Sequence, residues 1–138
     1  MAQPEQERVA ATRAWWDRVK TDLRSADVDL AATPPILDDA LFHAQQAAEK
    51  AMKDFLVWHD VPFRKTHDLT EIGRQCLRID ASLGPELQRA SLLSEYAWRF
   101  RYPMQGPPPD QAEVDQGLRT AREAVAAIAG RLPPEVSA

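Results

Sequence analysis

The sequence contains one cysteine, five glycines and no long apolar run, and each of these scarcities excludes a class of protein. Cys76 alone can form neither an internal disulfide nor a Cys-x-x-Cys motif for metal or redox chemistry. No apolar run approaches the roughly 20 residues of a membrane-spanning helix, and the N-terminal residues lack the apolar stretch of a signal peptide. We therefore expect a cytoplasmic protein that does not cross a membrane.

The net charge is −4, which argues against a protein that coats nucleic acid without selectivity. The charge is unevenly distributed along the chain. Residues 61–103 carry 7 basic and 5 acidic side chains, whereas the segments on both sides are net acidic. An anionic ligand is therefore expected to bind in this middle segment.

Helix-forming residues dominate the composition, and apolar residues recur at steps of three and four, the spacing of amphipathic α-helices. The first such segment ends at Pro34 and Pro35, because proline lacks a backbone donor and restricts the residue before it. Its apolar face comprises Val9, Thr12, Trp16, Val19, Leu23, Ala26 and Leu30. A second helix is predicted from about 37 to 58, with an opposite polar face that comprises Asp39, Gln46, Glu49, Lys50 and Lys53.

A third helix is predicted to begin after Asp68, because Glu71 follows at the spacing of a capping box. Gly84 and Pro85 mark a break and a restart, since proline suits the first position of a helix. The fourth helix is predicted to run to about residue 100.

The last helix has apolar residues at heptad-like spacing from Val114 to Leu132, where two prolines end it. Five amphipathic helices with short breaks pack most simply side by side. We expect residues 1–138 to form one all-α domain with a core of about 6–132. The predicted architecture is an up-and-down four-helix bundle with an additional C-terminal helix.

Three stretches carry a resemblance to a known family. They are Ala-Gln-Gln-Ala-Ala-Glu-Lys-Ala at 44–51, Thr-His-Asp-Leu at 66–69, and Tyr-Ala-Trp-Arg-Phe-Arg-Tyr-Pro at 96–103. In this order and at this spacing they resemble the HEPN domain, over about residues 6–130. The resemblance implies a four-helix core with an extra helix, usually in a homodimer. Many relatives pair with a minimal nucleotidyltransferase in a two-component or toxin–antitoxin system, and others are ribonucleases.

The ribonucleases of this family use an arginine followed, after four to six residues, by a histidine. None of the three histidines, at 43, 59 and 67, has an arginine at that distance before it. No general acid or base stands at the matching positions after Arg99 or Arg101. We therefore predict no catalytic residue. The remaining route to a ribonuclease is a composite site that brings His67 to Arg99 or Arg101, within one chain or across a dimer.

Nucleotide binding is a more open hypothesis. Arg64 and Lys65 precede a helix whose first N–H groups can receive a phosphate, and arginines can add bidentate contacts. The candidate nucleotide or anion ligands are Arg64, Lys65, His67, Arg99, Arg101 and Tyr102. In the alternative interpretation, Arg99 and Arg101 pair with carboxylates such as Glu49 or Glu95 and only stabilise the bundle.

The remaining polar residues suggest no further chemistry. Gln46, Glu49 and Lys50 either line a polar surface together with Arg99 or form a plain exposed face. Asp27-Val28-Asp29 is similar to the aspartate pair with which nucleotidyltransferases hold magnesium, but it lacks their Gly-Ser and is predicted to be solvated. Transferase activity would then need a separate subunit.

No metal and no cofactor are predicted. His43 and His59 are 16 residues apart, and we identified no carboxylate or thiol at ligand spacing from them. Cys76 is interpreted as a small core residue.

The leading hypothesis from the sequence is a homodimeric partner of a nucleotidyltransferase that also binds a nucleotide. Two alternatives stay open. One is an atypical ribonuclease toxin that cleaves RNA, and the other is a purely structural dimerisation module.

Overall fold

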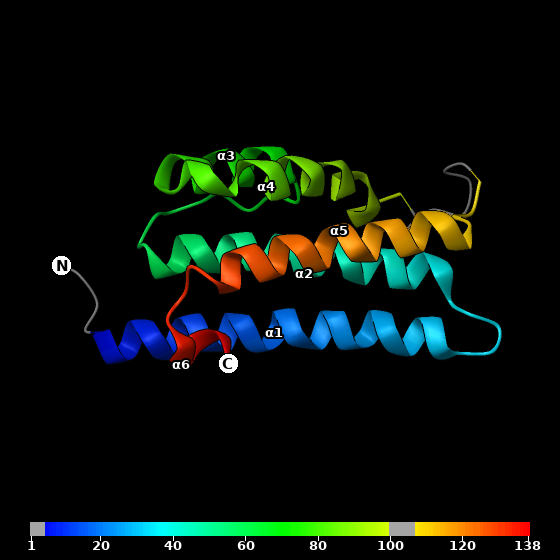
Figure 1. Cartoon of the computed structure of the whole chain (residues 1–138), viewed down its shortest axis with the longest axis horizontal. Coiled ribbons are helices and arrows are strands. Elements are labelled where there is room, and N and C mark those ends of the chain that lie inside the picture. Colours follow the sequence, from blue (N-terminus) through cyan, green and yellow to red (C-terminus); the bar gives the residue numbers. More distant parts are fainter. Residues whose placement is uncertain (1–4, 100–106) are drawn as a thin grey trace.

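The computed structural model describes residues 5–99 and 107–138, and this part of the chain is helical, without a β-strand (Figure 1). None of the described helices combines the length and the apolarity that a membrane crossing requires. In chain order the elements are α1 (Glu5–Ala31), α2 (Leu37–Trp58), α3 (Leu69–Ile79), η1 (Ala81–Leu83), α4 (Gly84–Ala90), η2 (Ser91–Ala97), α5 (Gln111–Ala129) and α6 (Pro134–Ser137).

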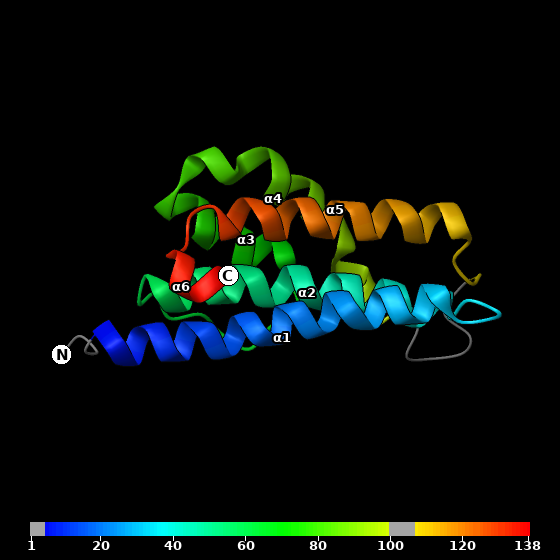
Figure 2. The same ribbon diagram turned by 60° about the horizontal axis from the view of Figure 1, so that its bottom comes forward.

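The chain passes back and forth along one long axis, as expected for an up-and-down bundle. α1 and α2 pack against each other in opposite directions, and α5 packs on α2 (Figures 1 and 2). α3 and α4 form a shorter layer above them, and α6 returns to α1. There, Lys20 Nζ donates a hydrogen bond to the backbone oxygen of Ala138 at 3.0 Å. The all-α bundle predicted from the sequence is confirmed.

α2 lies at the centre of the core, because small side chains let its neighbours approach closely. Five alanines of α2 are fully buried: Ala40, Ala44, Ala47, Ala48 and Ala51. On α5, Gly117 faces Leu41, and a Cβ atom added at Gly117 would overlap the Leu41 side chain. The close packing of α5 on α2 therefore depends on the absence of a side chain at this position.

Two buried side chains that carry a donor, Thr12 and Cys76, each donate a hydrogen bond to a backbone oxygen. The Thr12 hydroxyl, on the predicted core face of α1, donates a hydrogen bond to the backbone oxygen of Arg8 at 2.7 Å. Cys76 is buried as predicted, and its thiol donates to the backbone oxygen of Met52 at 3.4 Å. Burial raises the pKa of the Cys76 thiol to about 12, so the thiolate required for reactivity does not form near neutral pH.

The predicted start of α3 is confirmed, although only half of the capping box forms. The Asp68 carboxylate accepts hydrogen bonds from the backbone N–H groups of Thr70 and Glu71 at 2.9 and 3.5 Å. The Glu71 carboxylate instead accepts two bonds from Arg64, at 2.8 and 2.9 Å.

The fourth predicted helix is wrong in its second half. The α-helix ends at Ala90, and the chain continues as the 3-10 helix η2. Two serine hydroxyls compete there for backbone groups: Ser91 donates to the oxygen of Gln88 at 2.6 Å, and Ser94 donates to the oxygen of Ser91 at 2.9 Å. Helix α6 was not predicted, because it follows the prolines that were interpreted as the end of the last helix.

Candidate functional site

A cluster of polar side chains is buried on α2 around Glu49. Gln45, Glu49 and Lys53 share one helical face, because they follow each other at four-residue spacing. Glu49 is 3% exposed and accepts hydrogen bonds from Gln45 Nε2 at 3.0 Å and from Lys53 Nζ at 3.1 Å. His67, from the loop before α3, brings its Nδ1 to 2.8 Å from the same carboxylate. The cluster thus joins α2 to the start of the next layer.

The expected polar surface of Gln46, Glu49 and Lys50 does not form as such. Glu49 is buried, so the alternative of a plain exposed face is wrong for this residue, and Lys53 of the predicted polar face is buried as well. Gln46 donates to Gln45 Oε1 at 2.6 Å, and Lys50 Nζ lies 2.6 Å from the carboxylate of Asp22 on α1. Gln45 and Lys53 contact the buried Glu49 carboxylate from the same helix, whereas His67 reaches it from a separate segment, and periodicity along α2 cannot reveal that last partner.

His67 is held by the cluster but remains accessible. Its side chain is 53% exposed, whereas the Glu49 side chain is 4% exposed. The contact with Glu49 fixes one ring nitrogen and leaves the other for a solvent or ligand contact. This histidine therefore combines a fixed orientation with access from outside.

A groove lies over the outer side of α3 and the loop before it. Its volume is about 580 Å³, within the usual range of small-molecule sites. Gln75 Nε2 donates to the backbone oxygen of Pro62 at 2.9 Å and so fixes the loop against α3. The lining residues are Pro62, Phe63, Arg64, Glu71, Arg74, Gln75 and Arg78.

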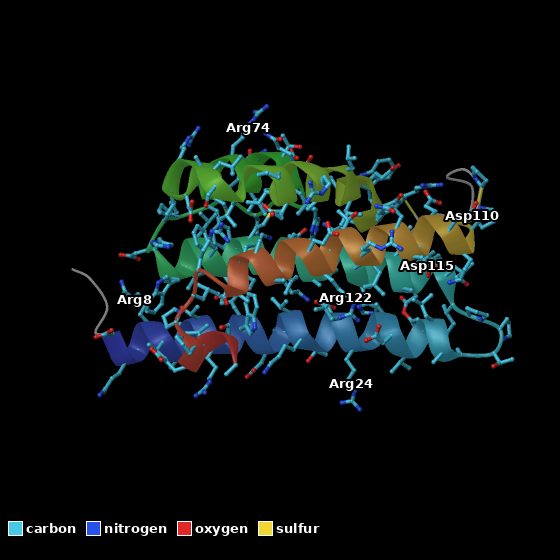
Figure 3. The ribbon with its side chains drawn as sticks, viewed as in Figure 1. Arg8, Arg24, Arg74, Asp110, Asp115 and Arg122 are labelled. Atoms are coloured by element: carbon cyan, nitrogen blue, oxygen red, sulfur yellow. The ribbon has the colours of Figure 1, made fainter. Side chains whose placement is uncertain are left out.

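The groove carries a net positive charge, since three arginines face one carboxylate. Arg64 pairs with Glu71. Across residues 5–99 and 107–138, neither Arg74 nor Arg78 has a carboxylate partner within ion-pair distance. The Arg74 side chain points away from the bundle into solvent (Figure 3). These two guanidinium groups can therefore bind an anion without breaking an existing ion pair.

Sequence reasoning missed Arg74 and Arg78, although a signal for them was present. They are four residues apart on the predicted third helix, so they share a face. They also belong to the only net positive third of the sequence.

Arg99 lies in a different environment from Arg64. Its guanidinium donates to Glu113 at 3.0 Å and to the backbone oxygen of Pro107 at 3.3 Å, and it lies 3.9 Å from Glu95. The Tyr96 hydroxyl donates to Glu113 at 2.9 Å. The alternative that Arg99 pairs with a carboxylate is therefore supported, with Glu113 as the nearer partner and Glu95 as the more distant one. Glu49, the other carboxylate considered, contacts His67 instead.

The six predicted anion ligands thus divide among several places. Arg64 lines the groove, with Lys65 exposed beside it on the same loop. His67 and Arg99 have separate carboxylate partners. Arg101 and Tyr102 lie outside the described residues.

The predicted solvated aspartate pair of α1 is wrong for one member. Asp27 is exposed and forms an ion pair with Arg122 of α5 at 2.6 Å (Figure 3). Asp29 is buried at 8% exposure. The two residues lie on different faces of the helix because two positions correspond to about 200° of rotation.

The bundle, with its polar cluster on α2 and its arginine-lined groove outside, is that of a small all-helical domain. Comparison with known proteins identifies the family of this domain. The profile of the HEPN domain family matches residues 12–131, and the chain belongs to that family. A search of curated protein sequences found no match. The chain is similar to the crystal structure of an archaeal HEPN homologue, with a TM-score of 0.67 and 25% sequence identity over 87% of this chain and 96% of that chain.

Proposed function

We propose that this HEPN protein is a homodimeric binding partner of a nucleotidyltransferase, in a two-component or toxin–antitoxin-type system, and that it binds a nucleotide through its phosphates. The proposal of nucleotide binding rests on the groove over α3. There, Arg74 and Arg78 have no ion-pair partner among the described residues. Phosphate oxygens suit guanidinium groups, which donate paired hydrogen bonds to them.

Arg74→Ala and Arg78→Ala are each expected to weaken binding of a nucleoside triphosphate about tenfold or more. The reason is that one charge-assisted hydrogen bond contributes about 1.5–3 kcal/mol. Isothermal titration calorimetry with ATP measures this change. Arg24→Ala is the matched control, because Arg24 is an exposed arginine that points away from the bundle on α1 (Figure 3). Equal affinities of the wild type and both groove variants would contradict the proposed site.

The partner-binding part is supported by exposed apolar side chains on and next to η2. Leu92 is 76% exposed and Trp98 is 51% exposed, and large apolar side chains left in contact with solvent are candidates for contact with another protein. Trp98 belongs to the family-like stretch 96–103, and Leu92 precedes that stretch on η2. Phe100 and Tyr102, further along the same stretch, lie outside the described residues.

The partnership is tested by co-expression of the chain with a minimal nucleotidyltransferase from the same genome, followed by light scattering of the purified species. We expect a stable complex that contains two copies of this chain. Leu92→Asp should separate the copies, whereas Val28→Asp, an equally apolar exposed position on α1, should not. A monomer that never copurifies with a transferase would contradict this part of the proposal.

A ribonuclease is the second candidate, because the contact of His67 with the buried Glu49 orients an accessible imidazole. Such a carboxylate–histidine pair is suited to general base catalysis. RNA cleavage by the purified wild type that is lost in His67→Ala but retained in His59→Ala would establish this activity in place of pure binding. No cleavage by the wild type would exclude this candidate.

A further inference from the structure

A second polar cluster joins the end of α1 to the beginning of α2, at the end of the bundle opposite the N-terminus (Figure 1). One ligand atom from each of Asp29, Asp39 and His43 lies within 4.8 Å of the other two. Asp29 belongs to the last turn of α1, and Asp39 and His43 are four residues apart on α2. Asp39 therefore stands at ligand spacing from His43, contrary to the expectation from the sequence.

The buried member of the cluster lacks a donor. Asp29 is 8% exposed, and its Oδ2 atom is buried and accepts no hydrogen bond. Its nearest polar neighbours in the cluster are the Asp39 carboxylate and the His43 ring. A buried carboxylate oxygen without a donor is costly, so this arrangement requires a proton or a cation between the acceptors.

A fourth residue orients the imidazole for such a role. His43 Nδ1 lies 2.9 Å from Asp22 Oδ1, and Lys50 Nζ lies 2.6 Å from the other oxygen of Asp22. When Nδ1 donates to Asp22, the lone pair of Nε2 faces Asp39 Oδ2, which lies 3.4 Å away. Histidine ligands of metals characteristically donate their second N–H to a carboxylate in this way.

We propose that Asp29, Asp39 and His43 bind one divalent transition-metal ion, such as Zn²⁺, with Asp22 as the residue that positions His43. One imidazole nitrogen and two carboxylate oxygens suit Zn²⁺ or Mn²⁺ better than Mg²⁺, which prefers oxygen ligands and water. Three protein ligands leave at least one coordination position for water or an external ligand. The side chain of Asp39 is 49% exposed, so an ion can enter from solvent.

The alternative occupant is a proton shared between the two aspartates. The pKa of Asp29 is raised to about 6, first by burial and then by the hydrogen bond and the charge of Asp39, while His43 lowers it and Asp38 raises it. A cation bound between the two carboxylates would relieve their repulsion in the place of this proton.

The test is metal binding by the untagged full chain at pH 7.5, measured by equilibrium dialysis with elemental analysis. We expect one Zn²⁺ per chain, together with the visible absorption of inner-sphere Co²⁺ after substitution. Asp39→Asn and His43→Gln should each weaken Zn²⁺ binding about tenfold or more, since even the loss of an outer-shell partner typically costs 10- to 100-fold. A metal ion that binds the folded protein stabilises it, so Zn²⁺ should raise the melting temperature of the wild type more than that of His43→Gln.

Two matched controls separate ligands from general charge and from other histidines. Asp38→Asn removes the same charge one residue away from Asp39, and His59→Gln removes a histidine from the far end of α2. Both variants should retain the Zn²⁺ affinity of the wild type to within about threefold, a smaller change than the 10- to 100-fold loss typical of an outer-shell partner. Absence of Zn²⁺ binding by the wild type at millimolar concentration would overturn the proposal, as would equal losses in Asp38→Asn and Asp39→Asn. Circular dichroism establishes that each variant is folded.

Discussion

Glu49→Ala is expected to lower the free energy of unfolding by about 3–5 kcal/mol, because removal of one partner of a buried ion pair leaves the other charge uncompensated. Lys53 is 8% exposed, and Glu49 is its carboxylate partner at 3.1 Å. Gln45, which is fully buried, also loses the acceptor of its amide. Urea denaturation followed by circular dichroism measures the loss.

The control for this prediction is Glu71→Ala, which removes a carboxylate from the exposed ion pair with Arg64. The Arg64 side chain is 73% exposed, so the expected loss is less than about 1 kcal/mol. The double substitution Glu49→Leu with Lys53→Met should recover part of the loss of Glu49→Ala, because no buried charge remains. Equal losses in Glu49→Ala and Glu71→Ala would show that the cluster does not hold α2 to the next layer.

Asp54 is expected to make the protein less stable as the pH rises from about 4 to 8. Its side chain is fully buried, both carboxylate oxygens lack a hydrogen-bond partner, and burial raises its pKa from 3.8 to about 8. In this pH window the folded chain keeps the proton that the unfolded chain releases. The favourable contribution of protonated Asp54 to the free energy of unfolding is therefore fully present below about pH 4. It is lost as the pH rises through the folded-state pKa.

The slope from this one group approaches about 1.4 kcal/mol per pH unit, or about 3 kcal/mol between pH 5 and pH 7. Asp54→Asn keeps the shape of the side chain and removes the titration. The difference in unfolding free energy between the variant and the wild type should therefore shift by that amount in favour of the variant as the pH rises. Asp60→Asn, at an exposed aspartate beyond the end of α2, is the control for the effect of an Asp-to-Asn substitution as such. A pH-independent difference for Asp54→Asn would contradict the raised pKa.

The sequence predicted the helices well where one periodic apolar stripe meets proline or a capping residue. The predicted second helix, about 37–58, has the observed bounds of α2, and the stripe from Val114 to Leu132 is buried throughout. Residues 91–97 were harder to predict, because local serine hydrogen bonds changed the type of helix without changing the apolar pattern. Three-residue and four-residue spacings do not distinguish a 3-10 helix from a short α-helix.

The candidate sites were predicted less completely, for a related reason. Arg64 was predicted as a basic residue of the loop and lines the groove. Arg74 and Arg78 were not predicted, and they line the same groove because α3 packs beside that loop. Asp29 and Asp39 approach each other because the segment between α1 and α2 reverses the chain.

By itself, the sequence determined that the chain is all-helical, where most helices begin and end, and which family it resembles, because these properties follow from residue spacing along one chain. Only the tertiary structure decided which polar side chains are buried and with which partners. The members of each pair come from separate segments of the chain: Glu49 with His67, and Asp29 with Asp39. The free energy of burying a charge depends on such neighbours, which only packing brings together.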